Sequence, residues 1–397
     1  MTSRSSTYLF RRLAVLFASV LAIVTVNGQA ASPPQGVPAP PAQKQVMADD
    51  VYKNLQELKG ITAAELWDTM GFIAAATGFN CVGCHVNESL ISMDKFAEDT
   101  PRKRRARQMI AMTRTINKTQ FGGAQIVTCN TCHNGQNRPV AIPSLLAQYS
   151  LPEEDPNAVE TVAGTTGPSA TDIFAKYLQA LGGVEHVRAL TSVAAKGTYS
   201  GYDTYNLPVP YEVYAKAPNQ RTVIVHTQNG DNTTTLNGQV GWVAAVDKPT
   251  PLMPATPPQL AGMKFDTDVT FPANISRALN QWRTGYPVTA VGDKDANVVE
   301  GTGAAGTRTK LFFDAKSGLL LRSVRFTNTV IGTVPVQTDY EEYKDVAGVQ
   351  IPVKLTVTWT SGQAKIVLTD VQANVAIDAA KFAEPAPAVL KRRGAGQ

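Results

Sequence analysis

The sequence predicts an α+β protein with two domains, an all-α domain followed by a β-rich one. Apolar residues recur at helical spacing up to about residue 149, whereas short β segments bounded by turn residues begin after Leu190. The intervening stretch is acidic, rich in Pro, Gly and Thr, and has no periodicity, which is typical of a domain boundary. The expected parts are an all-α domain at 47–149, a linker at 150–170, a β-rich domain at 171–386 and a basic tail at 387–397.

The N-terminus has the pattern of a secretory signal peptide. Arginines precede an apolar run of 14 residues, Leu13 to Val26, and small residues follow it. This run is shorter than the roughly 20 residues of a membrane-spanning helix, and an uncleaved anchor is the alternative. We expect a signal peptide at 1–30 and a Pro-rich linker at 31–46. The mature chain is then periplasmic or otherwise exported, either free or associated with a membrane.

Three helices are expected in the first domain. A short amphipathic segment covers residues 49–60, and a second helix begins after Thr62, which forms a capping box with Glu65. The third helix covers residues 101–117, with Thr100 as its cap and a proline in the favoured first turn. The apolar faces of the second and third helices comprise Leu66, Met70 and Ile73 and, respectively, Met109, Met112 and Ile116.

The β-rich domain is expected to begin with a helix at residues 171–183, capped by Thr171. Short β segments follow, separated by turn signals such as Asn237-Gly238 and Ala347-Gly348. One interruption, at residues 254–283, predicts a loop and then a helix. Many short strands joined by hairpins predict one antiparallel curved sheet or half-barrel with a few helices.

All four cysteines lie in two identical Cys-x-x-Cys-His units, CVGCH at residues 81–85 and CNTCH at residues 129–133. Two cysteines at this spacing present both thiols to the vinyl groups on one edge of a haem, and the next residue brings an imidazole to the iron. The pattern is the attachment signature of c-type haem. The sequence therefore predicts two covalently bound haems, with attachment through Cys81, Cys84, Cys129 and Cys132 and iron ligation by His85 and His133.

Three other roles explain the cysteines less well. A zinc site with four thiolates would have to bridge a spacing of 48 residues, longer than in the usual zinc ribbon, and it leaves both histidines unexplained. Redox-active Cys-x-x-Cys pairs need a strand-to-helix context and do not need two copies. Ordinary disulfides form in exported chains, but they require neither the repeated spacing nor the histidines.

Each haem iron needs a sixth ligand or an open position, and Met and His are the candidate ligands. Apart from the two motif histidines the chain has only His186 and His226, which we interpret as a helix-surface and a strand histidine beyond the linker. Met70 lies eleven residues before the first motif. Met112 lies seventeen residues before the second, with Met109 one turn earlier as its alternative. Elimination therefore predicts Met70 and Met112 as axial ligands, although helical methionines more often serve core packing.

The segments LWDTMGFIAAATGFNCVGCHV, DTPRKRRARQMIAMTRTIN and VTCNTCHNGQNRP resemble the cytochrome c subunit of photosynthetic reaction centres. The similarity covers about residues 47–148. In that family four haems form two tandem helix–haem pairs, and the subunit passes electrons to an oxidised chlorophyll pair. The resemblance implies a multihaem cytochrome c domain, haem attachment at both motifs, Met70 as an axial ligand, and photosynthetic electron transport.

The chain also departs from that family. It has two of the four haem motifs, and no cysteine follows the apolar run to carry a lipid. The last haem of the family takes a distant histidine as its sixth ligand, and the all-α domain has no such histidine. Met112 as a ligand therefore rests on elimination and not on the resemblance.

The β-rich part loosely resembles the half-barrel of exported lipoprotein-carrier proteins, through the hairpin pattern of residues 318–359. Such half-barrels hold apolar ligands on their concave face. An apolar ligand is therefore one expectation for this domain, and a purely structural or docking role is the simpler one.

The distribution of charge indicates which kinds of binding partner to expect. A formal net charge of +5 is mild for 397 residues, so we expect no nucleic-acid partner. Basic residues nevertheless crowd the start of the third helix, where they oppose the helix dipole at a cost of a few tenths of a kcal/mol each. They predict pairing with haem propionates or steering of an acidic or membrane-bound redox partner, with a solvated face as the alternative. The cluster comprises Arg102, Lys103, Arg104, Arg105 and Arg107, and Arg138 is a further propionate candidate.

Together these patterns predict an exported dihaem c-type cytochrome that carries electrons between a donor and an acceptor protein, and not an enzyme. One alternative is a haem enzyme of the peroxidase type, in which one iron keeps an open position. The other is a carrier of apolar ligands that is fused to a haem redox module.

Overall fold

The structure is a computed structural model that describes residues 43–143, 167–248, 250–303 and 307–391. We call residues 43–143 the helical part and residues 167–391 the sheet part. The predicted signal peptide lies outside the described residues, as do most of both predicted linkers and the end of the basic tail.

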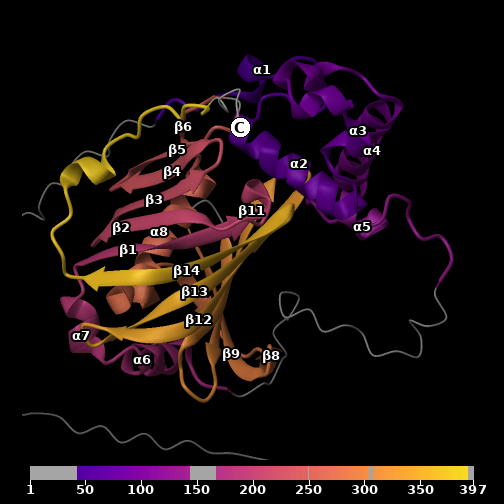
Figure 1. Ribbon diagram of the computed structural model, residues 1–397. Coiled ribbons are helices and arrows are strands. Elements are labelled where there is room, and N and C mark those ends of the chain that lie inside the picture. Colours follow the sequence, from indigo (N-terminus) through magenta and orange to yellow (C-terminus); the bar gives the residue numbers. More distant parts are fainter. Residues whose placement is uncertain (1–42, 144–166, 249, 304–306, 392–397) are drawn as a thin grey trace, which may run out of the picture. The chain divides into compact units, whose positions relative to one another are not determined.

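The helical part contains short and long helices joined by tight turns (Figure 1). Its elements are α1 (Ala48–Val51), α2 (Ala63–Thr77), α3 (Cys81–Cys84), η1 (Asn87–Leu90), η2 (Met93–Ala97), α4 (Pro101–Gln120) and α5 (Cys129–His133). Both predicted caps are confirmed. The Thr62 side chain accepts a hydrogen bond from the Glu65 N–H at 3.1 Å, and Thr100 accepts one from the Lys103 N–H at 3.1 Å.

Two local predictions for the helical part were wrong. The expected helix at 49–60 ends at Val51, because Asn54 adopts a left-handed backbone with φ of 60° and its side chain bonds the Ala97 carbonyl at 2.7 Å. The expected apolar face of α4 is also displaced. The buried residues of that helix are Ile110, Thr113 and Asn117.

The core of the helical part is small and apolar. It gathers Leu58 and Ile61 from the turn before α2 with Leu66 and Phe72 of α2 and Ile110 of α4. Met70 and Ile73, which sequence spacing placed on the same face as Leu66, pack against this cluster. The face of α2 was therefore predicted correctly, and it carries Met70 toward the interior.

The sheet part is one antiparallel sheet of 14 strands within the described residues. The strands are β1 (Ser192–Gly201), β2 (Val209–Lys216), β3 (Gln220–Thr227), β4 (Gly230–Asn237), β5 (Val240–Ala244), β6 (Met253–Pro254), β7 (Asn280–Arg283), β8 (Thr289–Val291), β9 (Lys294–Thr302), β10 (Arg308–Asp314), β11 (Leu320–Thr329), β12 (Gly332–Val346), β13 (Val349–Trp359) and β14 (Gly362–Ala373). Their order is β6-β5-β4-β3-β2-β1-β14-β13-β12-β11-β10-β9-β7, with β8 paired to β9.

The predicted hairpins account for most of this order. Gly238 and the pair Ala347-Gly348 have positive φ values of 65°, 55° and 82°, as tight turns between antiparallel strands require. One pairing is not local: β1 pairs with β14, which joins the first and last hairpin series into one sheet. The expected curved antiparallel sheet is confirmed, and Figure 1 shows its curvature.

Two predictions at helices of the sheet part need correction. The first helix, α6, covers Ala170–Ala180 and is capped by Ser169, not by Thr171. Within residues 254–283, the segment expected to be a loop is the helix α8 (Pro257–Thr270), since Thr256 and Gln259 form a capping box ahead of two prolines. The segment expected to be a helix is a short 3-10 turn, η6 (Pro272–Arg277), followed by β7.

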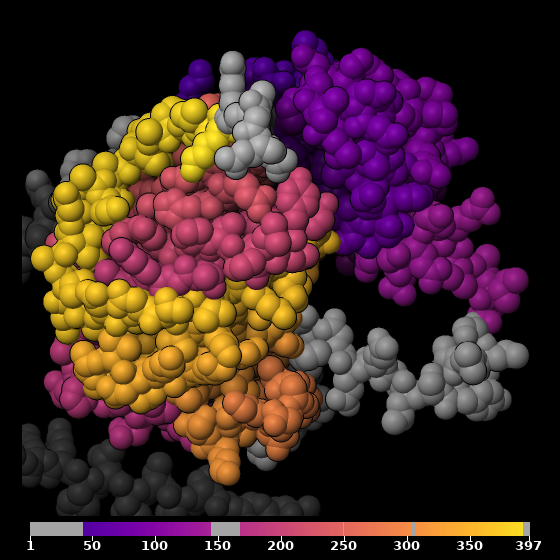
Figure 2. Space-filling model, in the orientation of Figure 1, coloured from indigo at the N-terminus to yellow at the C-terminus, as the bar shows by residue number. Residues whose placement is uncertain are grey.

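Helices fill the concave side of the curved sheet. The largest core combines α6 and α8 residues such as Phe174, Tyr177 and Phe265 with Leu311 and Phe313 of β10. α8 also contacts β3, β4 and β5 at the other end of the sheet. After β14 the chain lies across β3 and β4, visible along the outside in Figure 2. The interior of the curve is therefore occupied by side chains of the protein's own helices.

Candidate functional site

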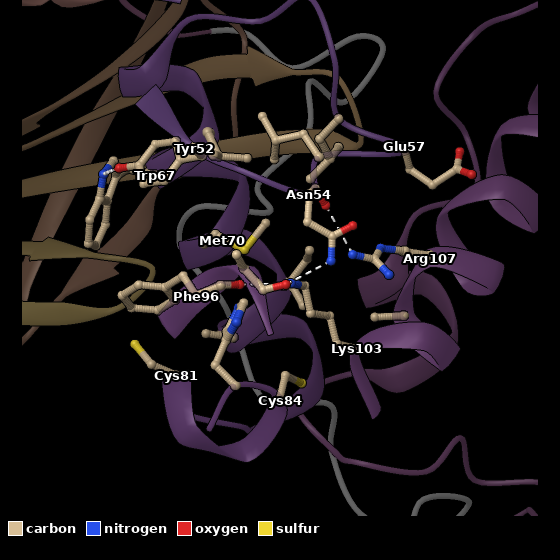
Figure 3. A pocket seen from close by; sticks show the side chains of 18 of the residues that line it. Tyr52, Asn54, Glu57, Trp67, Met70, Cys81, Cys84, Phe96, Lys103 and Arg107 are labelled. Carbon is tan, nitrogen blue, oxygen red and sulfur yellow. Dashed lines mark hydrogen bonds between the residues drawn. The ribbon is translucent and has the colours of Figure 1, made fainter. Parts of the chain in front are cut away.

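The first Cys-x-x-Cys-His unit borders a cavity of about 310 Å³ in the helical part. Figure 3 shows the Met70 thioether and the Cys81 and Cys84 thiols around the same space. The His85 ring and the side chain of Phe96 complete this wall. All four residues predicted for the first haem, Met70, Cys81, Cys84 and His85, therefore line one cavity.

The local sequence explains how α3 presents these groups. Gly78 ends α2 in a left-handed conformation with φ of 69°, and Asn80 then caps α3 by accepting from the Gly83 N–H at 3.0 Å. Gly83 itself permits close packing, because a Cβ there would lie 2.9 Å from the side chain of Phe79. The motif thus forms one helical turn that faces the cavity.

Burial favours the neutral forms of the thiol and the imidazole in the first unit. Burial raises the pKa of the Cys84 thiol. Burial lowers the pKa of His85, the Lys103 ammonium lowers it further, and the Phe96 carbonyl acts in the opposite direction. A lowered pKa favours the neutral imidazole, the form in which it binds a metal.

The Nδ1 atom of His85 is buried at this wall, and it has no hydrogen-bond partner among the described residues. A neutral imidazole, two free thiols and a thioether around one largely apolar space fit a c-type haem.

The basic start of α4 is used within the protein. Arg102 donates to the Gly83 carbonyl at 2.9 Å, and the Thr100 hydroxyl donates to the Cys84 carbonyl at 2.5 Å. Arg107 bonds the Asn54 carbonyl at 3.1 Å and pairs with Asp99 at 2.8 Å. The bonds from Arg102 and Thr100 satisfy carbonyls at the end of α3 that have no partner within that helix. Arg104 and Arg105 are exposed, as is Arg138.

The second unit forms α5, and its supports are different. Thr128 and Thr131 form a capping box around its first turn. The buried Asn117 of α4 exchanges two hydrogen bonds with the backbone of Val127, at 2.8 and 2.9 Å. His133 Nδ1 lies 2.9 Å from the Gln136 carbonyl. A carbonyl partner of this kind fixes the ring and leaves Nε2 for a metal.

The two units are packed against the same helix end. The Gly135 N–H, two residues after His133, donates to the Ala76 carbonyl of α2 at 2.9 Å. Gly78 approaches so closely that a Cβ there would lie 2.5 Å from the Gly135 carbonyl oxygen. Both Cys-x-x-Cys-His units therefore meet at the C-terminal end of the helix that carries Met70.

The structure places the other predicted residues less decisively. Met112 lies on α4 with 41% of its surface exposed, and Met109 on the same helix is half-buried. His186 lies on α7 (Val184–Ala189) at the surface, and its Nδ1 is 2.9 Å from the Gly182 carbonyl. His226 lies on β3 between carboxylates, 3.1 Å from Asp231. The last two positions match their interpretation as ordinary surface and strand histidines.

Several residues near the first unit were not singled out from the sequence. The rings of Phe96 and His85 pack edge to face, with 4.9 Å between their centroids. The Trp67 indole donates to the Tyr52 hydroxyl at 2.6 Å, and burial raises the pKa of Tyr52 to about 12. Both pairs join segments distant in sequence, and no spacing pattern indicates them.

The thiols and the helices also bear on metal binding and membrane spanning. All four cysteines are free thiols. Across the described residues, no group of three or more His, Cys, Asp or Glu side chains is placed to hold a metal ion. In the same part of the chain, no helix has the length and apolarity to cross a membrane.

The geometry of the first site fits the residues that hold a c-type haem. Residues 15–194 match the model of the family described as the photosynthetic reaction centre cytochrome C subunit. The match contains both Cys-x-x-Cys-His units and Met70, and it confirms the resemblance found in the sequence.

Solved structures are similar to about half of the chain. One is a LolA superfamily protein from Nitrosomonas europaea, with 12% identity, a TM-score of 0.36, and coverage of 53% of this chain and 96% of that one. Another is a DUF1329 family protein from Desulfovibrio piger, with 10% identity, a TM-score of 0.39, and coverage of 55% and 98%.

Proposed function

We propose that this chain is an exported c-type cytochrome with two covalently bound haems, which carries electrons between a donor and an acceptor protein. The observation that supports it most is the first cavity, where Cys81, Cys84, His85 and Met70 converge. The family match supports a cytochrome in the same residues. Photosynthetic electron transport is the role that the family implies.

In each site the cysteines would attach the haem, and a His and a Met would bind its iron. In the first site Cys81 and Cys84 would attach the haem, and His85 and Met70 would bind its iron. In the second site Cys129 and Cys132 would attach the haem, and His133 and Met112 would bind its iron. When bound, each haem supplies one-electron redox chemistry. The chain's own part is to orient the ligands, exclude water and set the potential.

Packing at the end of α2 supports transfer between the two sites. The Gly135–Ala76 hydrogen bond and the close approach at Gly78 hold the second unit against the helix that carries Met70. Neighbouring haems held by one rigid element suit an electron carrier, because little needs to rearrange when charge moves.

The test is the haem content of the full chain matured with the c-type attachment machinery. A pyridine haemochrome assay should give two haems per chain, and acid-acetone should extract none of them. A double variant, Cys129→Ala with Cys132→Ala, should give one. Haem that is extractable, or a ratio other than two in the parent protein, would contradict the proposal.

A peroxidase-type enzyme is the second candidate, because Met112 is 41% exposed and the second iron is the one whose sixth ligand is less well placed. Cyanide decides between the two, since it binds an open iron but not one with two protein ligands. The carrier proposal expects no cyanide binding at either iron in the parent protein and binding at one iron in Met112→Ala. Cyanide binding at one iron in Met109→Ala, without binding in Met112→Ala, would assign the sixth ligand to Met109. Binding in the parent protein would favour the enzyme.

A further inference from the structure

Lys103 of α4 has an unusual position for a lysine. Its side chain is only 14% exposed and lines the same cavity as His85. The ammonium donates to three consecutive carbonyls, Phe96 at 2.7 Å, Ala97 at 3.1 Å and Glu98 at 3.2 Å. An ammonium has three N–H donors, so all are used. Lys103 therefore has no donor left for a haem carboxylate, the role that the sequence suggested for this cluster.

The charge of Lys103 is only partly balanced. Asp99 lies 3.7 Å from Lys103, but the same carboxylate pairs with Arg107 at 2.8 Å. Two largely buried cations thus share one carboxylate, which is itself 34% exposed.

The other charged side chains on the cavity wall pair among themselves or with neighbours. Lys53 pairs with Asp94 at 3.0 Å at the exposed rim, and Glu57 pairs with Arg114 at 3.6 Å. Net positive charge remains on the side of the cavity that Lys103 and Arg107 form.

We infer that Lys103 raises the reduction potential of the first haem by keeping a buried positive charge beside it; this inference rests on the proposed function. A donor protein supplies one electron, and the charge of the site falls by one. A cation nearby favours the state of lower positive charge, and burial strengthens the effect because water screens it less.

The contacts described for the second unit include no charged side chain like Lys103. His133 and the α5 backbone are supported by Gln136, Thr128, Thr131 and Asn117, all of them neutral. The first haem should therefore have the higher potential of the two, so that electrons pass from the second haem to the first.

The test compares three variants of the full chain with both haems attached, by spectroelectrochemical titration. Lys103→Gln keeps an amide donor but removes the charge, and Lys103→Arg keeps the charge. Arg105→Gln removes an exposed charge from the same helix turn and is the control. We expect Lys103→Gln to lower the first potential by about 59 mV, a tenfold change in the one-electron equilibrium. Lys103→Arg, Arg105→Gln and the second haem should change far less.

A fourth variant should shift the reduction potential of the first haem in the opposite direction. Asp99→Asn removes the carboxylate that Lys103 and Arg107 share, so it should raise the first potential. This substitution lies at a more exposed position, which keeps the inference testable if Lys103→Gln does not fold.

The outcomes separate the inference from the function on which it rests. Unchanged potentials in both Lys103→Gln and Asp99→Asn, with two haems still bound, would overturn the role of the charge alone. An equal decrease in Lys103→Arg and Lys103→Gln would instead assign the effect to the hydrogen bonds to η2, and would also overturn it. A parent protein without covalent haem would contradict the proposed function itself.

Discussion

The two Cys-x-x-Cys-His units have the same motif but are held in different ways. The first depends on α4, because the cap of that helix, Thr100, lies sixteen positions after Cys84 and donates its hydroxyl to the Cys84 carbonyl. The second is capped by its own neighbours, Thr128 and Thr131, three residues apart. His85 is in contact with a cavity and has an unpartnered ring nitrogen, whereas the ring of His133 is fixed by Gln136.

This difference shows that the motif specifies attachment and not environment. In both units the spacing would bring two thiols and an imidazole to one edge of a haem. The charges, the burial and the second ligand come from whatever packs beside them. The first unit has two largely buried cations at its cavity wall, and the contacts described for the second unit include none, so the two sites should differ most in potential and in ligation.

Removal of the predicted thioether ligand gives the largest expected effect. Met70→Ala should abolish the far-red absorbance band of the first ferric haem and allow cyanide to bind its iron. If both irons have Met ligands, this loss is about half of the total far-red absorbance. Met93→Ala is the matched control, since Met93 lines the same cavity and is 41% exposed. An intact far-red band in Met70→Ala would show that the cavity does not use this thioether.

A smaller effect is expected where the two units meet. Gly78→Ala places a Cβ 2.5 Å from the Gly135 carbonyl at a φ of 69°, whereas Gly60→Ala has a φ of 74° and nothing within 4 Å. Gly60→Ala should cost about 1–2 kcal/mol of stability from backbone strain alone. Gly78→Ala should cost about 1–3 kcal/mol more, because of overpacking. Urea unfolding of the two variants measures this, and equal losses would mean that the approach at Gly135 is not a constraint.

The smallest expected effect is the difference in stability between variants of the two N-cap residues, Thr128 and Thr100. Thr128→Ala removes an N-cap side chain and should cost about 1 kcal/mol. Thr100→Ala removes a cap and also the hydrogen bond to the Cys84 carbonyl, which adds about 1 kcal/mol. Thermal unfolding monitored at the haem bands should therefore show a larger decrease for Thr100→Ala. A larger decrease for Thr128→Ala would place the more important support at the second unit.

Much of the local structure followed from short sequence signals. Thr62 and Thr100 were correct caps because capping involves residues only three positions apart. The hairpin turn at Ala347-Gly348 was correct because a tight turn needs residues that tolerate positive φ.

The errors occurred where a distant partner intervenes. The helix at 49–60 stops because Asn54 bonds Ala97 and Asp99, more than 40 residues away. The apolar face of α4 is displaced because Asn117, a polar residue, is buried to hold Val127. Periodicity assumes that apolar side chains face inward, so it misses a buried amide with two satisfied hydrogen bonds.

The sequence alone predicted the attachment chemistry, since two thiols and an imidazole at fixed covalent spacing need no tertiary contact to be recognised. It also determined the strands and most turns, which depend on neighbours along the chain. Only the tertiary structure decided that Met70 and His85 line one cavity, that the two units meet at Gly78 and Gly135, and that Lys103 is buried. These are matters of distance and burial between segments far apart in sequence, and no local pattern encodes them.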